Sequence, residues 1–139
     1  MPTILLVDHE TGYFDIYKDF LGKRGFDVGD ILTAQDGQDA LDKLTNHPID
    51  VCVIDIALPK LSGIEVVREC EFRQIPTQFI FLTGFGQGDK VFEQAMRAYN
   101  VRFIIEKGGI IMGDFLQKLE QCLTNVRGKR SNHLVQRTK

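Results

Sequence analysis

Five short apolar runs recur along the chain and predict five β-strands. They are Thr3–Val7, Val28–Thr33, Val51–Ile54, Gln78–Leu82 and Phe103–Ile105. The first, third and fourth are nearly continuous runs of Ile, Leu, Val and Phe. That pattern is typical of strands covered on both faces, as in a parallel sheet. We therefore expect a sheet that is buried between two layers.

A segment with apolar residues at helical spacing follows each predicted strand. The groups are, in chain order, Phe14, Tyr17, Phe20 and Leu21; Ala40, Leu41 and Leu44; Ile64 and Val67; Val91, Phe92, Ala95, Met96 and Tyr99; and Phe115, Leu116, Leu119, Cys122, Leu123 and Val126. Gly22 and Gly25 suit the end of the first helix. Five repeats of strand and helix predict an α/β fold, a flavodoxin-like doubly wound parallel sheet in the order 2-1-3-4-5 with five helices.

The length of 139 residues fits one domain, and the charge separates a body from a tail. The formal net charge is −2, but residues 127–139 hold five of the 17 Lys/Arg residues and no acid, which leaves 12 basic against 19 acidic residues before them. An acidic body is a poor nucleic-acid binder. We expect one domain over 1–126 and a solvated basic tail or linker over 127–139, with nucleic-acid contact by that tail as the alternative.

Three features predict a soluble cytoplasmic protein. No apolar run approaches the roughly 20 residues that a membrane span needs. No basic residue precedes the first apolar stretch, which ends at Asp8, so a signal peptide is not expected. The three cysteines, Cys52, Cys70 and Cys122, are odd in number and far apart in sequence. This favours reduced core thiols over a metal cluster or a nucleophile.

Polar side chains directly follow four of the predicted strands. They are Asp8, His9 and Glu10 after the first, Asp55 after the third, Thr83 after the fourth and Lys107 after the fifth. Ligands of doubly wound sheets bind beyond the carboxyl ends of the strands, so we expect these residues on one rim. Converging carboxylates repel unless a cation joins them, and oxygen ligands suit Mg²⁺. With a lysine to neutralise an anion and a hydroxyl to bond a phosphoryl oxygen, these are the parts of a phosphoryl-transfer site.

The sequence resembles the receiver domain of two-component response regulators over about the first 126 residues. The core of the likeness is the segment Val53–Glu65, in which a strand ends in Asp55 and a Pro and a Gly follow at set distances before the third helix. Other matching segments are Leu6-Val7-Asp8, Asp36-Gly37 with Ala40-Leu41, Leu82-Thr83-Gly84, and Lys107.

The resemblance implies a role for each of these residues. Asp55 is the nucleophile that takes a phosphoryl group from a histidine kinase, a phosphotransfer protein or a small phosphodonor. Asp8 and Asp55, with the backbone carbonyl of Ala57, hold Mg²⁺. Lys107 pairs with the acceptor carboxylate, and Thr83 moves toward the phosphoryl group to carry the signal outward. The family also implies binding of an effector or a second copy through the face of the fourth helix, fifth strand and fifth helix, and contact with nucleic acid only through a separate output domain.

Three positions depart from the family's pattern. His9 replaces the second acid after the first strand; it weakens Mg²⁺ binding, is bypassed by Glu10, or favours another metal. Gly108 stands where the family commonly has a proline, so the lysine before it is less well held. The aromatic switch residue, usually three positions before the lysine, is Ile104 here, with Phe103 beside it as the other candidate.

Two alternatives to a phosphorylatable receiver stay open. His9 and Gly108 also fit a degenerate receiver that binds partners without being phosphorylated. A different class, the aspartate-nucleophile phosphatases, is loosely resembled by the segment from Asp8 to Thr11, with Asp8 as nucleophile. Those enzymes need a cap or a further acidic pair, for which Asp89 is the only candidate in this short chain.

Overall fold

The fold is a five-stranded parallel sheet with helices on both faces. The computed structural model describes residues 2–23, 25, 30–84, 90, 93–94, 97, 100–107 and 112–131, with the backbone alone at 30, 112 and 125–131. Its elements are β1 (Thr3–Val7), α1 (Gly12–Lys23), β2 (Asp30–Ala34), α2 (Gly37–Asn46), β3 (Val51–Asp55), α3 (Gly63–Phe72), β4 (Gln78–Thr83), β5 (Val101–Glu106) and α5 (Met112–Ser131). The strand order β2-β1-β3-β4-β5 confirms the order predicted from the sequence.

Four helices lie in the described part of the chain, at the predicted places. Gly25 follows α1 with φ +70°, a left-handed conformation that suits glycine after a helix end. The residues that predicted a fourth helix, Val91, Phe92, Ala95, Met96 and Tyr99, lie outside the described residues. So do the start of the predicted second strand at Val28 and the loop position Gly108. None of the described helices is both long and apolar enough to cross a membrane.

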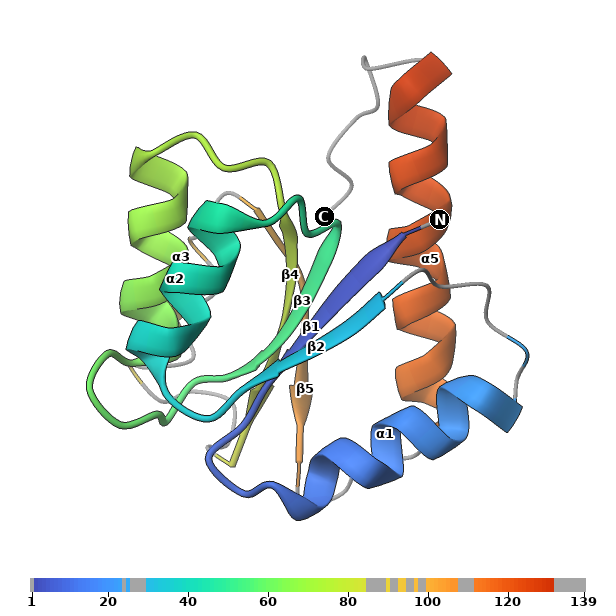
Figure 1. Ribbon diagram of the computed structural model, residues 1–139, viewed down its shortest axis with the longest axis horizontal. Helices are drawn as coiled ribbons and strands as arrows, with labels where there is room; N and C mark the ends of the chain where they lie inside the picture. Colours follow the sequence, from blue (N-terminus) through green and yellow to red (C-terminus); the bar gives the residue numbers. More distant parts are fainter. Residues whose placement is uncertain are drawn as a thin grey trace.

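The helices divide the core into two layers. Figure 1 shows α2 and α3 on one face of the sheet and α1 and α5 on the other. Because alternate residues of a strand point to opposite faces, each strand feeds both layers. The α2–α3 core takes Leu5, Cys52, Ile54, Phe79 and Phe81, among others, and the α1–α5 core takes Ile4, Leu6, Val53, Ile80 and Leu82. This explains why β1, β3 and β4 are nearly continuous apolar runs.

The last helix extends past the expected end of the domain. Its apolar residues from Phe115 to Leu123 are buried against the sheet, as the stripe predicted. The helix continues through Ser131, five residues beyond the boundary placed at 126. Residues 132–139 of the basic segment lie outside the described residues.

Candidate functional site

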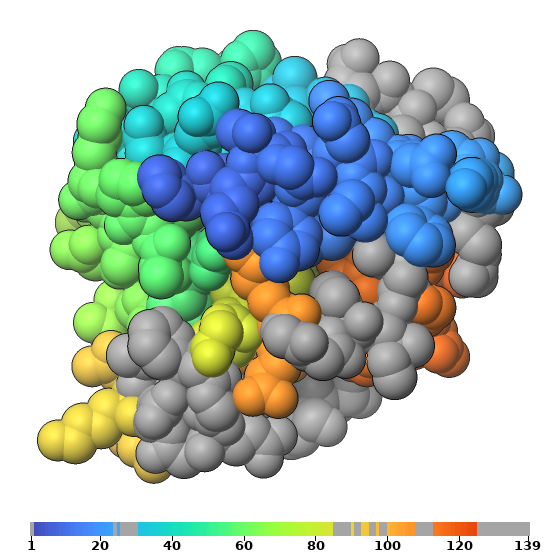
Figure 2. All heavy atoms as spheres, turned by 90° about the horizontal axis from the view of Figure 1, so that it is seen from below, coloured from blue at the N-terminus to red at the C-terminus, as the bar shows by residue number. Residues whose placement is uncertain are grey.

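The polar residues that follow β1, β3, β4 and β5 meet at the carboxyl edge of the sheet. Figure 2 shows this edge of the sheet. The blue segment at the start of α1 lies beside the green segment after β3, and the yellow end of β4 and the orange end of β5 are exposed next to them. The ammonium of Lys107 joins the acids, since it lies within 3.4 Å of Asp8, Glu10 and Asp55. The site predicted from the sequence is therefore assembled in one place.

Asp55 is the last residue of β3 and is 7% exposed. Its Oδ1 accepts a hydrogen bond from the backbone N–H of Ala57 at 3.2 Å, and its Oδ2 accepts one from Lys107 Nζ at 2.9 Å. Both oxygens are thus oriented by donors, one from the following turn and one from β5. A carboxylate held by two donors has a fixed orientation.

The turn after Asp55 is held by close backbone packing at the start of α3. The N–H of Gly63 donates to the carbonyl of Ile56 at 2.8 Å. A Cβ at Gly63 would lie 2.4 Å from the carbonyl oxygen of Asp55, so no larger residue fits without moving the strand end. Ser62 caps α3 by accepting from the N–H of Glu65, and Glu65 bonds back to the Ser62 N–H. Both features fix the direction in which the chain leaves the acceptor.

Asp8 follows β1 directly and is 1% exposed. Its backbone N–H donates a hydrogen bond to the carbonyl of Ala34. In the side chain, Oδ1 accepts a hydrogen bond from the Glu10 N–H at 2.8 Å, and Oδ2 lies 2.9 Å from Lys107 Nζ. Burial raises the pKa of this carboxyl, and the contacts with Lys107 and the Glu10 N–H oppose the rise without cancelling it. Asp8 is therefore a desolvated acid that depends on a cation.

Lys107 supplies that cation from the end of β5. Its N–H donates to the Thr83 carbonyl at 2.8 Å, and its Nζ lies 2.9 Å from both Asp8 and Asp55. Burial by itself lowers the pKa of this ammonium, but the hydrogen bonds and charges of Asp8 and Asp55 outweigh burial and raise it. The lysine is consequently charged at neutral pH, and it bridges the two acids.

Thr83 ends β4 and is 1% exposed. Since Phe81 belongs to the α2–α3 core, the alternation of β4 directs Thr83 to that same side of the sheet. On β5, Ile104 packs against the α2–α3 core and Phe103 against the α1–α5 core. Ile104 therefore shares the face of Thr83, and Phe103 lies on the opposite face.

The acids fit a hard cation, and the site offers one more oxygen donor. Asp8 and Asp55 present carboxylate oxygens to the same point, which suits Mg²⁺. His9 is exposed, whereas Glu10 extends to within 3.4 Å of the Lys107 ammonium. Within the described residues, no group of three His, Cys, Asp or Glu side chains is placed to hold a metal ion. Glu10 is thus an additional carboxylate beside the Lys107 ammonium.

An aromatic neighbour of the site was missed from the sequence. The ring of Tyr13, in the first turn of α1, lies 4.2 Å from Lys107 Nζ. Tyr13 in turn stacks on Tyr17, whose buried hydroxyl has no hydrogen-bond partner among the described residues. The spacing of four residues in a helix could have predicted that the two tyrosines touch. Their proximity to a lysine 94 positions later could not be read from the chain.

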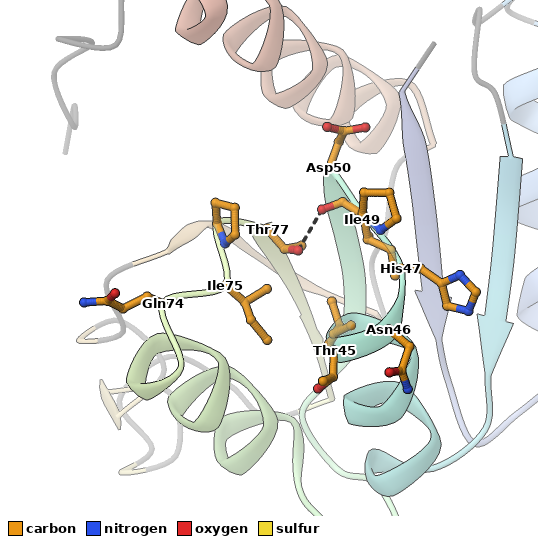
Figure 3. A pocket seen from close by; sticks show the side chains of 11 residues that line it. Thr45, Asn46, His47, Ile49, Asp50, Gln74, Ile75 and Thr77 are labelled. Carbon is orange, nitrogen blue, oxygen red and sulfur yellow. Dashed lines mark hydrogen bonds between the residues drawn. The ribbon is translucent and has the colours of Figure 1, made fainter.

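A hollow of about 500 Å³ lies at the opposite edge of the sheet. It is formed between the end of α2 and the segment before β4, and Figure 3 shows Thr77 bonded there to the carbonyl of Ile49. Its lining includes one acid, Asp50, which accepts from the Thr3 N–H. The described residues of this hollow hold no lysine beside paired acids, so the carboxyl edge is the candidate site.

Comparison with known proteins decides the family. The model of the response regulator receiver domain matches residues 4–121. The chain belongs to this receiver domain family. It is similar to the transcriptional regulatory protein TrcR of Mycobacterium tuberculosis, at 32% identity over 138 residues that cover 94% of this chain and 47% of that protein. It is also similar to the alkaline phosphatase synthesis transcriptional regulatory protein PhoP of Bacillus subtilis, at 36% identity over 80 residues, 58% of this chain and 32% of that protein.

Two solved structures with the same fold are receiver domains. One is the signal receiver domain of an HD domain-containing protein from Pseudomonas fluorescens, with a TM-score of 0.81 and 22% identity over 94% of this chain and 93% of that one. Another is a CheY-like receiver domain protein from Methanospirillum hungatei, with a TM-score of 0.78 and 22% identity over 93% and 98%. At this identity the likeness concerns the fold.

Family membership gives the class of function. A receiver domain of a response regulator acts in two-component signal transduction, where phosphorylation of an aspartate changes its interactions. Such domains generally bind Mg²⁺ at their acidic pocket, and response regulators interact with histidine kinases and effectors. The family is a signalling family rather than one of classical enzymes. This chain spans less than half the length of PhoP and of TrcR, the two regulators compared above.

Proposed function

We propose that Asp55 is the phosphoacceptor of this receiver domain, with Lys107 and Thr83 as its partners in the reaction. The observation that supports this most is the contact of Lys107 Nζ with both Asp55 and Asp8 at 2.9 Å. Both oxygens of Asp55 are oriented by donors at the strand end, from Ala57 and Lys107. A nucleophile needs that fixed direction to attack in line.

In the proposed reaction, one Asp55 oxygen attacks phosphorus and the bond to the donor's histidine nitrogen breaks, which leaves an acyl phosphate on Asp55. Lys107 neutralises charge on the acceptor before transfer and on the phosphoryl group afterwards. The Thr83 hydroxyl donates to a phosphoryl oxygen. Hydrolysis by water later returns the carboxylate and releases phosphate, so the domain promotes its own phosphorylation and dephosphorylation.

Asp8, Asp55 and the carbonyl of Ala57 would hold Mg²⁺, with Glu10 as the additional carboxylate. When bound, Mg²⁺ supplies positive charge that offsets the charge of the transferring phosphoryl group. With His9 in place of an acid, we expect weaker Mg²⁺ binding than in a receiver with two acids after the first strand. Glu10 is 66% exposed, and an exposed carboxylate restores only part of that affinity.

The wider role is proposed from the family and the relatives. A histidine kinase or phosphotransfer protein would donate the phosphoryl group in the cytoplasm. The signal would leave through the surface of the predicted fourth helix, β5 and α5, to an effector or a second copy of the domain. Because the matched relatives are longer transcriptional regulators, we propose that residues 1–126 are the receiver unit and 127–139 a tail or linker, and that any nucleic-acid contact belongs to a separate output domain.

Incubation with acetyl phosphate and Mg²⁺, followed by intact mass measurement, tests the acceptor. We expect one added phosphoryl group on the wild type, sensitive to hydroxylamine as an acyl phosphate is, and none on Asp55→Asn. Asp42→Asn is the matched control, since Asp42 is an exposed acid on α2. We expect it to be labelled like the wild type.

Two results would contradict this assignment. Labelling of Asp55→Asn that is lost in Asp8→Asn would transfer the nucleophile to Asp8. If the wild type is not labelled under conditions where a known receiver is labelled, the result supports the alternative of a degenerate receiver that binds partners without being phosphorylated. The addition of beryllofluoride with Mg²⁺ separates these cases, since a working acceptor should bind the analogue at Asp55 and shift the Thr83 resonances.

A further inference from the structure

Lys107 has an aromatic neighbour besides its acids. Its Nζ lies 4.2 Å from the centroid of the Tyr13 ring, within the about 6 Å at which a ring face attracts a cation. The lysine side chain is only 10% exposed, so water screens this attraction weakly. The ammonium is therefore in contact with the acids of β1 and β3 and with a ring from α1 at the same time.

The Tyr13 ring is itself held by an aromatic column, made of Tyr13, Tyr17 and Phe115. The Tyr13 and Tyr17 rings stack with centroids 5.9 Å apart, and Tyr17 meets Phe115 of α5 at 5.0 Å. Tyr17 is 2% exposed and Phe115 is completely buried. Because two of the three rings are fixed in the α1–α5 core, the Tyr13 ring face is a firm support for the lysine.

Within the part of the chain that the structure describes, the Lys107 side chain is ordered by the contacts of its ammonium. In the sequence, Gly108 and Gly109 follow it and carry no side chain. Its N–H bonds to Thr83, which fixes the backbone but leaves the flexible four-carbon stem to be ordered by the contacts of its ammonium. Asp8 and Asp55 attract that ammonium from two sides, Glu10 lies 3.4 Å from it, and the Tyr13 ring adds a contact from α1 at 4.2 Å.

We propose that Tyr13 is a positioning residue for Lys107, whose ring face keeps the ammonium between Asp8 and Asp55. The kinetic part of this inference rests on the proposed phosphoryl transfer to Asp55. The ring face is the active feature, so the hydroxyl of Tyr13 is dispensable. Tyr13→Phe should therefore behave like the wild type, and variants without a ring should not.

The first test needs no phosphoryl donor. In the full chain with ¹³C-labelled lysine, the Lys107 ε-methylene resonance, assigned by its loss in Lys107→Arg, should lie upfield because of the ring. It should stay there in Tyr13→Phe and move downfield in Tyr13→Leu. An unchanged Lys107 resonance in Tyr13→Leu would overturn the proposal. This outcome does not depend on whether Asp55 is phosphorylated.

The second test measures the rate of labelling by acetyl phosphate. We expect about a fivefold fall in Tyr13→Leu, the size that a partly buried cation–ring contact gives, and a rate within about twofold of wild type in Tyr13→Phe. Tyr13→Met keeps the length of the side chain without a ring and replaces Tyr13→Leu if that variant does not fold. The control is Phe72→Leu, an aromatic on α3 that is 84% exposed, which should leave the rate unchanged.

Equal slowing of Tyr13→Phe and Tyr13→Leu would overturn the proposal, because it would assign the effect to the hydroxyl. If no wild-type labelling is found while the Lys107 resonance responds to the ring, the proposed function fails and the positioning of the lysine stands. If the wild type is labelled and the Tyr13 variants do not differ from it, the positioning of Lys107 by Tyr13 fails and the proposed function stands.

Discussion

Removing the charge of Lys107 should destabilise the receiver domain, and Lys107→Met is the sharpest way to do it. Methionine keeps most of the length of the side chain but has no ammonium. In the wild type this ammonium is 2.9 Å from Asp8 and 2.9 Å from Asp55. In the variant, two nearly buried carboxylates face each other without the cation that joins them, so each loses its attraction while keeping its desolvation cost.

The size of the loss follows from these distances. Because both oxygens lie 2.9 Å from one nitrogen, they are separated by no more than twice that length. At about 6 Å and an effective dielectric constant of about 20, two like charges repel by about 3 kcal/mol. Breaking a buried ion pair by removing one partner costs a similar amount. We expect Lys107→Met to lower the free energy of unfolding by about 3 kcal/mol at pH 7 and the melting temperature by about 10 °C.

The decrease in the free energy of unfolding caused by Lys107→Met should become smaller as the pH falls. Burial already raises the pKa of Asp8 in the folded state, and loss of the ammonium raises it further. An acid whose pKa is raised in the folded state binds more protons there than in the unfolded chain. The free energy of unfolding therefore falls as the pH rises above the pKa that this acid has in the unfolded chain, and it is regained on acidification. Urea unfolding at pH 7 and pH 5 measures this. Mg²⁺ should also stabilise the variant more than the wild type.

Lys118→Met is the matched control. Its lysine also pairs with an acid, at 2.7 Å from Asp114, but this pair is on the surface of α5 and joins residues four apart. Such pairs contribute about 0.5 kcal/mol or less. A loss for Lys107→Met no larger than that of Lys118→Met, or one equal at pH 5 and pH 7, would refute the view that Lys107 compensates two buried acids.

Two further predictions concern packing. Gly63→Ala should cost about 2 kcal/mol and slow the labelling of the domain, because its Cβ would lie 2.4 Å from the Asp55 carbonyl oxygen. Gly22→Ala, with no atom within 4 Å of its Cβ, should instead stabilise by about 0.5 kcal/mol, and urea unfolding compares the two. The thiols of Cys70 and Cys122, whose pKa values burial raises to about 12, should react with iodoacetamide at pH 8 only after urea unfolds the chain. Fast alkylation of the folded protein would contradict that burial.

The parts of the fold that were predicted correctly depend on local pattern. The apolar run Thr3–Val7 coincides with β1, and Asp55 is found at the end of β3, because a strand covered on both faces needs apolar residues at every position. The strand order follows from repeated right-handed crossovers. The placement of acids, threonine and lysine on one edge is a consequence of parallel strands and needed no knowledge of side-chain contacts.

The parts that were missed depend on contacts between distant residues. β5 begins at Val101, two residues before the predicted run, and Arg102 within it is paired with the side chain of Gln78. The pairing of β4 with β5 shifts register there: Phe79 faces Val101 and Ile80 faces Phe103. An irregularity of this kind decides which face a residue takes, so the choice between Phe103 and Ile104 for the face of Thr83 could not be made from spacing alone.

The charges at the carboxyl edge explain why His9 is the departure with the largest expected effect. Asp8, Asp55 and Lys107 together carry one negative charge, and Glu10 is exposed enough for water to screen its contribution. A phosphoryl group on Asp55 replaces one negative charge by nearly two. The lysine alone then leaves the site more negative than before, in a place where water compensates poorly. A divalent cation removes this excess, and each acid absent from the edge weakens its binding. On the proposed phosphoryl transfer to Asp55, we therefore expect His9→Asp to raise both the affinity for Mg²⁺, measured by titration, and the rate of labelling by acetyl phosphate.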